Sequence, residues 1–387
     1  MKYLFYTASI LWILFEFANV YFIMPLPGSQ KINSLEFAYS LYSWRWYIRC
    51  LLGLVMISGF RVAFQKSKLL STLVFLFVLF VIYQFNFEFS ADKMFYAPKN
   101  LILKPVDSNE IDPDRLVLGI SMNGEFRAYP IYLIGYHHQV ADKIGDKSIL
   151  ITYCTVCRTG RCYEALVNHK LENFRLVGMD HFNALLEDHS TKSWWRQSTG
   201  ECVVGPLKGS FLAEFPSQQT SLKTWIDLHP NTQIMQEDPV YKIKYDSLAL
   251  YEAGKSKGKL TKKDSSSWSD KSWIIGIQIG NDSRAYDWNQ LIKDQMILDQ
   301  IGNTFIVLLL SSDKKSFFAF ERPTPESKFI FRNDSLFMNS IYYRFTGESL
   351  NFTSVEHPKL KHINAYQEFW HSWKTFHPNS DRYQVLE

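Results

Sequence analysis

The chain has 387 residues, of which 47% are hydrophobic and 16% aromatic, and its formal net charge is +4. This length is sufficient for one large or two ordinary domains with proper cores. The small net charge, without a long basic run, argues against nucleic acid as a partner. Five cysteines are too few for a disulfide scaffold, and an odd number leaves at least one thiol unpaired.

The N-terminal region is strongly apolar. Residues 4–24 and 69–86 are almost continuously apolar, and residues 44–63 are apolar around Arg49. At about 1.5 Å per residue, such segments can cross a hydrocarbon core of about 30 Å. We therefore predict three transmembrane helices at about these bounds, with the lipid bilayer as a partner. Glu16, inside the first segment, is expected to face Arg49 or the neighbouring Arg45 across the helix bundle.

The loops between these segments predict an orientation. Residues 61–68 carry three positive charges and no negative charge, which places this loop in the cytoplasm by the positive-inside rule. With three spans, the large C-terminal domain is then extracytoplasmic, and periplasmic in a Gram-negative cell. If residues 44–63 only lie on the membrane surface, two spans place that domain in the cytoplasm instead.

The chain after the apolar region repeats itself. An offset of 157 residues (284 − 127) aligns Arg127-Ala-Tyr with Arg284-Ala-Tyr, and a Trp-x3-His-Pro-Asn pattern recurs at 225–231 and 373–379. Landmarks repeated in one order predict two homologous halves. The predicted domains are a transmembrane region at 1–90, a first β-rich repeat at 91–235, a connector at 236–270 and a second, degenerate repeat at 271–387.

Each predicted half consists mainly of short strands. Runs of β-favouring residues separated by turn residues predict strands at 116–121, 125–129, 148–153, 161–166 and 173–177, then a meander at 185–188, 193–197 and 201–204. A short helix is expected after Pro130, and helices at 222–228 and 365–376 close the halves, with His229 and His377 as helix terminators. The predicted fold class is α+β: a β-rich, internally duplicated domain after an N-terminal transmembrane helical region.

A CxxC pattern is the central candidate for a functional site in this sequence. An apolar, strand-like run ends in Cys154 and Cys157, followed by turn-like residues at 159–160. Two intervening residues let one tight turn direct both sulfurs at one metal ion, or let one thiol attack a disulfide formed by the other. The offset places Ser311 and Lys314 at these positions in the second half, so the fold does not need the thiols. We therefore predict that the pair is functional.

Other candidate residues lie in the first half. His137 precedes the strand that carries Cys154, and imidazole with thiolate suits copper or zinc. The predicted metal ligands are Cys154, Cys157, His137 and His181. The candidate catalytic residues are Cys154, Cys157, Asp180, Asn183 and Gln197, and the candidate cofactor-binding residues are Trp195 and Arg196. The alternative for each histidine is a surface or satisfied core residue, and Trp194, Cys162 and Cys202 are expected to be buried core residues.

These segments resemble the family catalogued as domain of unknown function 3179. The resemblance is carried by His137, Asp142 and the segments EFRAYP (125–130), TYCTVCRTG (152–160), LVGMDHFN (176–183), WWRQSTGE (194–201) and GPLKG (205–209). It is dense over about 110–235 and thin in the second half, which lacks the thiols. The resemblance implies relatedness without an assigned reaction.

Three functions are left open, and with them the question of whether the chain is an enzyme. The first is a copper or zinc centre, or a redox centre, on Cys154 and Cys157 with His137 and His181. The second is a thiol-disulfide oxidoreductase in which Cys154 attacks and Cys157 resolves, with a small molecule or a protein thiol as partner. Against it, no thioredoxin-like helical run follows the pair. The third is a non-catalytic domain whose aromatic-lined pocket binds a peptide, glycan or lipid.

Overall fold

A computed structural model describes residues 2–246, 248–332, 334–338, 341–350 and 359–384. The chain divides into two compact units, which we describe separately. The first unit comprises residues 1–96 and 172–211, and the second comprises residues 97–171 and 212–387. The chain is mixed α+β, with N-terminal helices followed by a β-rich region of several sheets, as the sequence predicted.

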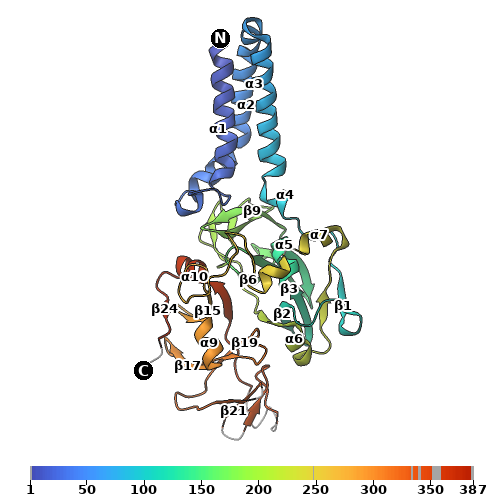
Figure 1. Cartoon of the computed structure of the whole chain (residues 1–387), viewed down its shortest axis with the longest axis vertical. Coiled ribbons are helices and arrows are strands. Elements are labelled where there is room, and N and C mark those ends of the chain that lie inside the picture. Colours follow the sequence, from blue (N-terminus) through green and yellow to red (C-terminus); the bar gives the residue numbers. More distant parts are fainter. Residues whose placement is uncertain (1, 247, 333, 339–340, 351–358, 385–387) are drawn as a thin grey trace. The chain divides into compact units, whose positions relative to one another are not determined.

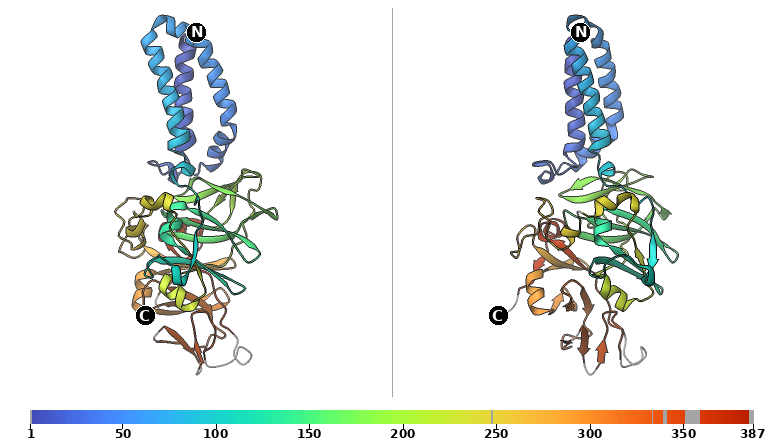
Figure 2. Two further views of the ribbon diagram at one scale, coloured as in Figure 1. Left: turned by 90° about the vertical axis from the view of Figure 1, so that its right-hand side faces the viewer. Right: turned by 45° about the vertical axis from the view of Figure 1, so that its right-hand side comes forward.

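The first unit begins with three helices that are long and apolar enough to cross a membrane: α1 (Lys2–Tyr21), α2 (Leu35–Lys66) and α3 (Lys68–Tyr83), the last extended by a π-helical turn at Gln84–Glu88. They lie side by side in the views of Figures 1 and 2. Nε and Nη2 of Arg49 donate to the two oxygens of Glu16, both at 2.7 Å, and Asn86 also bonds Glu16 at 3.1 Å. The expected pairing of Glu16 with an arginine of the bundle is confirmed, and it leaves no uncompensated charge at this position.

The first unit also contains an antiparallel sheet in the order β12-β11-β10-β9. Its strands are β9 (Phe174–Asp180), β10 (Asn183–Asp188), β11 (Trp194–Arg196) and β12 (Cys202–Val204). One apolar cluster joins Ile23 and Ala38 of the helical region to Val177, Leu185 and Trp194 of the sheet. The predicted meander therefore packs against the N-terminal helical region, and residues 172–211 of the predicted first repeat belong to this unit.

The second unit starts with two sheets. The first has the order β1-β14-β3-β2-β13 and the second β4-β5-β6. Their elements are β1 (Leu103–Pro105), β2 (Leu116–Met122), β3 (Glu125–Pro130), α5 (Ile131–His137), β4 (Gln139–Ile144), β5 (Lys147–Cys154), β6 (Thr159–Glu164), β13 (Gln218–Ser221), α6 (Leu222–Leu228) and β14 (Gln233–Met235). Strand β14 runs parallel to β3, and the other pairs are antiparallel.

The rest of the second unit forms sheets in the orders β23-β15-β16-β24, β17-β18-β19 and β20-β21-β22. The elements are β15 (Trp273–Ile279), β16 (Asp282–Asp287), α9 (Trp288–Asp294), β17 (Met296–Ile301), β18 (Thr304–Leu310), β19 (Phe317–Glu321), β20 (Ile330–Arg332), β21 (Ser335–Met338), β22 (Ile341–Tyr343), β23 (Ala365–Phe369), α10 (Trp370–Phe376) and β24 (Asp381–Arg382). Between the two sets, the connector holds α7 (Lys242–Tyr245) and α8 (Leu248–Glu252). Short elements elsewhere are α4 (Ala91–Met94), β7 (Leu166–Val167) and β8 (Lys170–Leu171).

The two sets of elements have the same order. Strands β15 to β18, with α9, each start 157 residues after their counterparts β2 to β5 and α5, from 273 − 116 to 304 − 147. The Tyr129 hydroxyl donates to Asp142 at 2.6 Å, and the Tyr286 hydroxyl donates to Asp299 at 2.7 Å. Strand β24 runs parallel to β16, as β14 does to β3.

Two local predictions were wrong. Residues 365–369 form strand β23 rather than the first turns of a helix, because they pair along β15 and their aromatic side chains suit a buried strand. Residues 159–160 begin β6 rather than forming a turn, because they pair with Cys154 and Tyr153. The turn that carries Cys157 lies at residues 155–158.

Candidate functional site

The CxxC pattern forms a tight loop between β5 and β6. Cys154 is the last residue of β5, Cys157 lies in the loop, and both are fully buried. Arg158 closes the loop with a φ of 58°, in the left-handed region. The side chain of Cys157 forms a hydrogen bond with that of Cys154. All five cysteines lie in the described part of the chain, and no disulfide joins any two of them.

The surroundings of Cys157 favour its protonated form. Burial raises the pKa of the Cys157 thiol well above its usual range, and the hydrogen bond and charge of Cys154 raise it further. The positive charge of Lys271 and the hydroxyl of Ser372 act in the opposite direction. Ser372 Oγ is buried without a well-aligned hydrogen bond among the described residues, so the hydroxyl remains available to the neighbouring thiol.

Residues from the second set of elements cover this loop. The backbone N–H of Phe369 donates to Cys157 O at 2.9 Å, and Lys271 Nζ donates to Val156 O at 2.6 Å. His371 Nε2 lies 3.2 Å from the same oxygen and 3.1 Å from Lys271 Nζ. Burial lowers the pKa of Lys271, and burial with the charge of Lys271 lowers the pKa of His371 to about 4.

Lys271, His371 and Ser372 were not predicted from the sequence. They lie more than a hundred residues after the cysteines, in the half that lacks thiols. The signal that could have indicated two of them is the polar pair His371-Ser372 inside the aromatic run of residues 369–373.

His137 is held by tyrosines. It ends α5, is fully buried, and its Nε2 lies 2.7 Å from Tyr245 Oη, with the ring of Tyr241 also in contact. The adjacent His138 is also buried, and burial lowers its pKa to about 4. Across the residues that the structure covers, no group of three or more His, Cys, Asp and Glu side chains is arranged to hold a metal ion. The metal ligand set of Cys154, Cys157, His137 and His181 therefore stays a prediction.

The remaining candidates form a polar cluster in the first unit. Asp180 Oδ1 lies 2.6 Å from His181 Nδ1, and Asp180 Oδ2 accepts from Arg196 Nε and Nη2 at 2.9 and 2.7 Å. Arg196 Nη1 also donates to Glu201 at 2.7 Å. Although burial acts to raise it, the hydrogen bond from His181 and the charge of Arg196 hold the pKa of Asp180 below its usual range. The hydrogen bond to Asp180 raises the pKa of His181.

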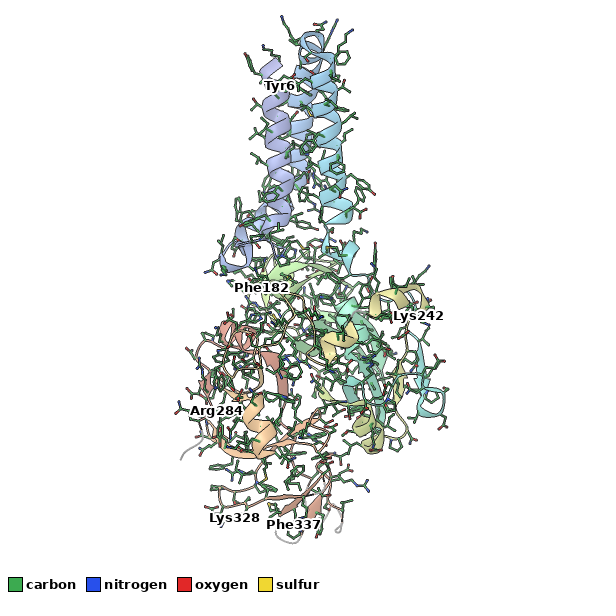
Figure 3. All side chains as sticks on the ribbon, viewed as in Figure 1. Tyr6, Phe182, Lys242, Arg284, Lys328 and Phe337 are labelled. Carbon is green, nitrogen blue, oxygen red and sulfur yellow. The ribbon has the colours of Figure 1, made fainter. Side chains whose placement is uncertain are left out.

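The turn between β9 and β10 presents His181. His181 and Phe182 have φ values of 48° and 69°, as in the two-residue hairpin turn that suits twisted strands. Figure 3 labels Phe182 in this turn. Behind the turn, Asn183 Nδ2 donates to Gln197 Oε1 at 3.0 Å, and both side chains are fully buried. The cluster is therefore a preformed arrangement of polar groups.

The two tryptophans of β11 are core residues. Trp194 is fully buried and donates to Glu187 at 3.0 Å, and Trp195 is buried and donates to Asp188 at 2.9 Å. Cys162 and Cys202 are also buried, as expected. The structure brings the candidates of the first unit together as one group, while Cys154, Cys157 and His137 belong to the second unit.

Comparisons with known proteins place the chain in a family without adding a reaction. Neither the curated proteins nor the solved structures contain a match to the chain. The family described as "Protein of unknown function (DUF3179)" matches residues 101–380, well over half of the sequence, and the chain therefore belongs to this family.

Proposed function

We propose that Cys154 and Cys157 form a thiol redox centre in a membrane-anchored protein. The observation that carries this proposal is the hydrogen bond between two buried thiols in one tight CxxC loop. Thiols held in contact can form a disulfide with little backbone movement. The positive charge of Lys271 acts against the larger effect of burial on the pKa of Cys157, and would stabilise a thiolate at the pair.

In this proposal Cys154 is the attacking thiol and Cys157 the resolving thiol. Burial, with the hydrogen bond and charge of Cys154, raises the pKa of Cys157, which agrees with a resolving thiol that stays protonated at rest. The Cys154 thiolate attacks a substrate disulfide, forms a mixed disulfide, and releases one substrate thiolate, which takes up a proton. Cys157 then loses its proton and attacks Cys154 Sγ, which releases the second substrate thiol. The protein dithiol is oxidised to a disulfide and the substrate disulfide is reduced to two thiols.

Trapping experiments on the full-length protein in detergent test this assignment. Cys157→Ser should accumulate a mixed disulfide at Cys154 with a small disulfide such as oxidised glutathione, detected by mass spectrometry. Cys162→Ser is the matched control, because Cys162 is equally buried on the neighbouring strand and should not change trapping. Absence of a Cys154 adduct in Cys157→Ser would contradict the redox assignment.

A copper or zinc centre is the second candidate function. It is supported by the same convergence of two sulfurs, since thiolates are preferred ligands of Cu(I) and Zn. His137 and His181 are its proposed additional ligands. In this case Cys154→Ser, Cys157→Ser and His137→Ala should each lower the metal content of the purified protein. Under the redox assignment, His137→Ala should leave adduct formation at Cys154 unchanged.

For the location, we propose that α1, α2 and α3 span a membrane and that the β-rich domain is extracytoplasmic. The support is the connection between α2 and α3, where Arg61, Lys66 and Lys68 have no acidic neighbour. Helix α2 has 32 residues, more than a membrane span needs, and its first turns pack against the sheet of the first unit. A reporter fused to the C-terminus should behave as extracytoplasmic, and a cytoplasmic result would overturn this topology.

We further propose that the two sets of elements in the second unit arose by duplication. The constant offset of 157 residues, the paired Tyr–Asp hydrogen bonds and the parallel strands β14 and β24 support it. A second similarity is the packing of Trp225 against Gly119 and of Trp373 against Gly276. An experimental structure in which Arg127 and Arg284 occupy unrelated positions would contradict the duplication.

A further inference from the structure

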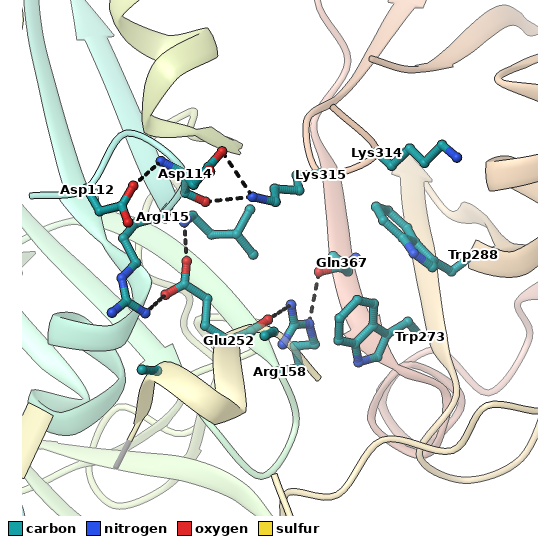
Figure 4. A pocket seen from close by; sticks show the side chains of 13 residues that line it. Asp112, Asp114, Arg115, Arg158, Glu252, Trp273, Trp288, Lys314, Lys315 and Gln367 are labelled. Carbon is teal, nitrogen blue, oxygen red and sulfur yellow. Dashed lines mark hydrogen bonds and ion pairs between the residues drawn. The ribbon is translucent and has the colours of Figure 1, made fainter. Parts of the chain in front are cut away.

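A cavity of about 370 Å³ lies in the second unit, close to the CxxC loop. Its lining includes Arg115, Arg158, Glu252, Trp273, Trp288 and Gln367 (Figure 4). The volume lies within the range of about 300–1,000 Å³ that is typical of small-molecule sites. Two indole rings supply apolar walls, and the polar groups are few, as in sites that bind one small organic molecule.

Arg158 is a buried cation of this cavity that has no carboxylate partner among the described residues. Its side chain is buried, with the residue 1% exposed. Nε donates to Gln367 Oε1 at 2.9 Å and Nη2 donates to Glu252 O at 3.3 Å, and both acceptors are neutral. Within the described chain, Nη1 makes no hydrogen bond. A buried guanidinium without a paired anion is costly, so an anion that enters the cavity would gain a strong partner.

The acidic residues of the cavity are bonded to other groups. Both oxygens of the Glu252 carboxylate are used, one by the backbone N–H of Leu116 and one by Arg115. The charge of Arg158 acts to lower the pKa of Glu252, against the larger effect of burial, but the hydrogen bond between the two residues is to the Glu252 backbone. Asp114 pairs with Lys315 at 3.4 Å.

Further positive charge surrounds the aromatic wall. The guanidinium of Arg158 and the ammonium of Lys263 each lie 3.8 Å from the ring centroid of Trp273. Burial and, to a smaller extent, the charge of Arg158 lower the pKa of Lys263, while the charge of Asp287 acts to raise it. Trp273 Nε1 is buried and has no hydrogen-bond partner among the described residues, so a further donor is available beside the cavity.

We propose that this cavity binds a small organic carboxylate. The carboxylate pairs with Arg158, and the apolar body of the ligand lies against Trp273 and Trp288. Guanidinium and carboxylate match in geometry, and the indole walls favour a ligand with a flat apolar body over a bare inorganic anion. Neither Cys154 nor Cys157 lines the cavity, and the proposal does not depend on their chemistry.

Titration calorimetry on the full-length protein in detergent tests the proposal, with three probes. Benzoate carries both charge and ring, benzamide the ring alone, and inorganic phosphate the charge alone. Benzoate should bind at least about tenfold more tightly than either of the others, a difference of about 1.4 kcal/mol. Equal binding of benzoate and benzamide would overturn the proposal, since the charge of Arg158 would then contribute nothing.

Two variants locate the binding. Arg158→Gln should weaken benzoate binding at least about tenfold, although removal of a buried side chain can also disturb folding. Ala253→Phe avoids this difficulty, because Ala253 lines the cavity from an exposed position and a phenyl group there should obstruct it. It should weaken benzoate binding by a similar factor with an unchanged unfolding temperature. If Ala253→Phe binds benzoate as the unaltered protein does, the ligand is not in this cavity and the proposal is wrong.

Discussion

Replacement of Glu368 by glutamine should destabilise the second unit substantially. Arg161 Nη2 pairs with Glu368 Oε1, and the two side chains are 3% and 1% exposed. In Glu368→Gln the guanidinium stays buried, and Glu214, at 3.8 Å and 39% exposed, is the acidic neighbour that remains. Breaking a buried pair on one side costs about 3–5 kcal/mol. Because Glu214 still compensates part of the charge, we expect about 3 kcal/mol.

Thermal unfolding of the full-length protein checks this value. For a unit of this size, 1 kcal/mol lowers the midpoint by about 2–4 °C, so Glu368→Gln should lower it by about 6–12 °C. The matched control is Glu321→Gln, which breaks an exposed pair and should cost less than about 1 kcal/mol. In this pair the side chain of Lys361 is 78% exposed and that of Glu321 is 38% exposed. The double variant Arg161→Met, Glu368→Leu should recover most of the loss, because no charge is then buried. If Glu368→Gln unfolds like the control, the reasoning about the pair is wrong.

Three further predictions concern packing, titration and truncation. Gly276→Ala should lower the free energy of unfolding by about 1–3 kcal/mol, because the new Cβ would lie 2.2 Å from an indole carbon of Trp373; thermal unfolding measures it. NMR titration should give His181 a pKa above its ordinary value, and Asp180→Asn should lower it. The stabilisation from this pair is therefore fully present below about pH 6.5 and is lost as pH rises through the folded-state pKa. Deletion of residues 1–90 should yield a protein that aggregates in size-exclusion chromatography, because the sheet β9 to β12 loses the apolar surface on which it packs; a monodisperse product would contradict this packing.

Local patterns predicted most elements of the fold. The hairpin β2–β3 and the helix α6 were predicted within one residue, because alternation, turn residues and capping act over a few neighbours. Strand β23 was predicted as helix, because its aromatic residues suit either structure and only pairing with β15 decides between them. The grouping of β9 to β12 with the N-terminal helices also depends on distant contacts, such as the hydrogen bond of 2.7 Å from Met179 N to Ile23 O.

The candidate site was predicted only in part, because local patterns are visible in the sequence and contacts between distant residues are not. The two cysteines were found because their spacing is local. The residues that surround the cysteines were not predicted, because Lys271 and Ser372 are brought to Cys157 by the packing of one set of elements on the other. The cavity beside Arg158 was also not predicted, since Trp273 and Gln367 come from the later set. Chemistry carried by one loop can be recognised in a sequence, whereas an environment assembled from separate elements cannot.

In the second set of elements, the loop between β18 and β19 corresponds in the element order to the CxxC loop and contains no thiol. Asp313 Oδ2 accepts from Ser221 Oγ at 2.7 Å and from Thr224 Oγ1 at 3.1 Å, and Ser316 Oγ accepts from Ser221 N at 2.8 Å. The closing helices α6 and α10 are related by an offset of 148 residues, which pairs Thr224 with Ser372 (372 − 224).

Each closing helix region therefore contacts the loop of the other set, which agrees with the proposed duplication. In one contact, a carboxylate and hydroxyl groups bond directly. In the other, a serine hydroxyl and a lysine face two buried thiols. The first contact contains no thiol, so thiols are not required to join the sets, and this supports the proposal that Cys154 and Cys157 are present for their chemistry.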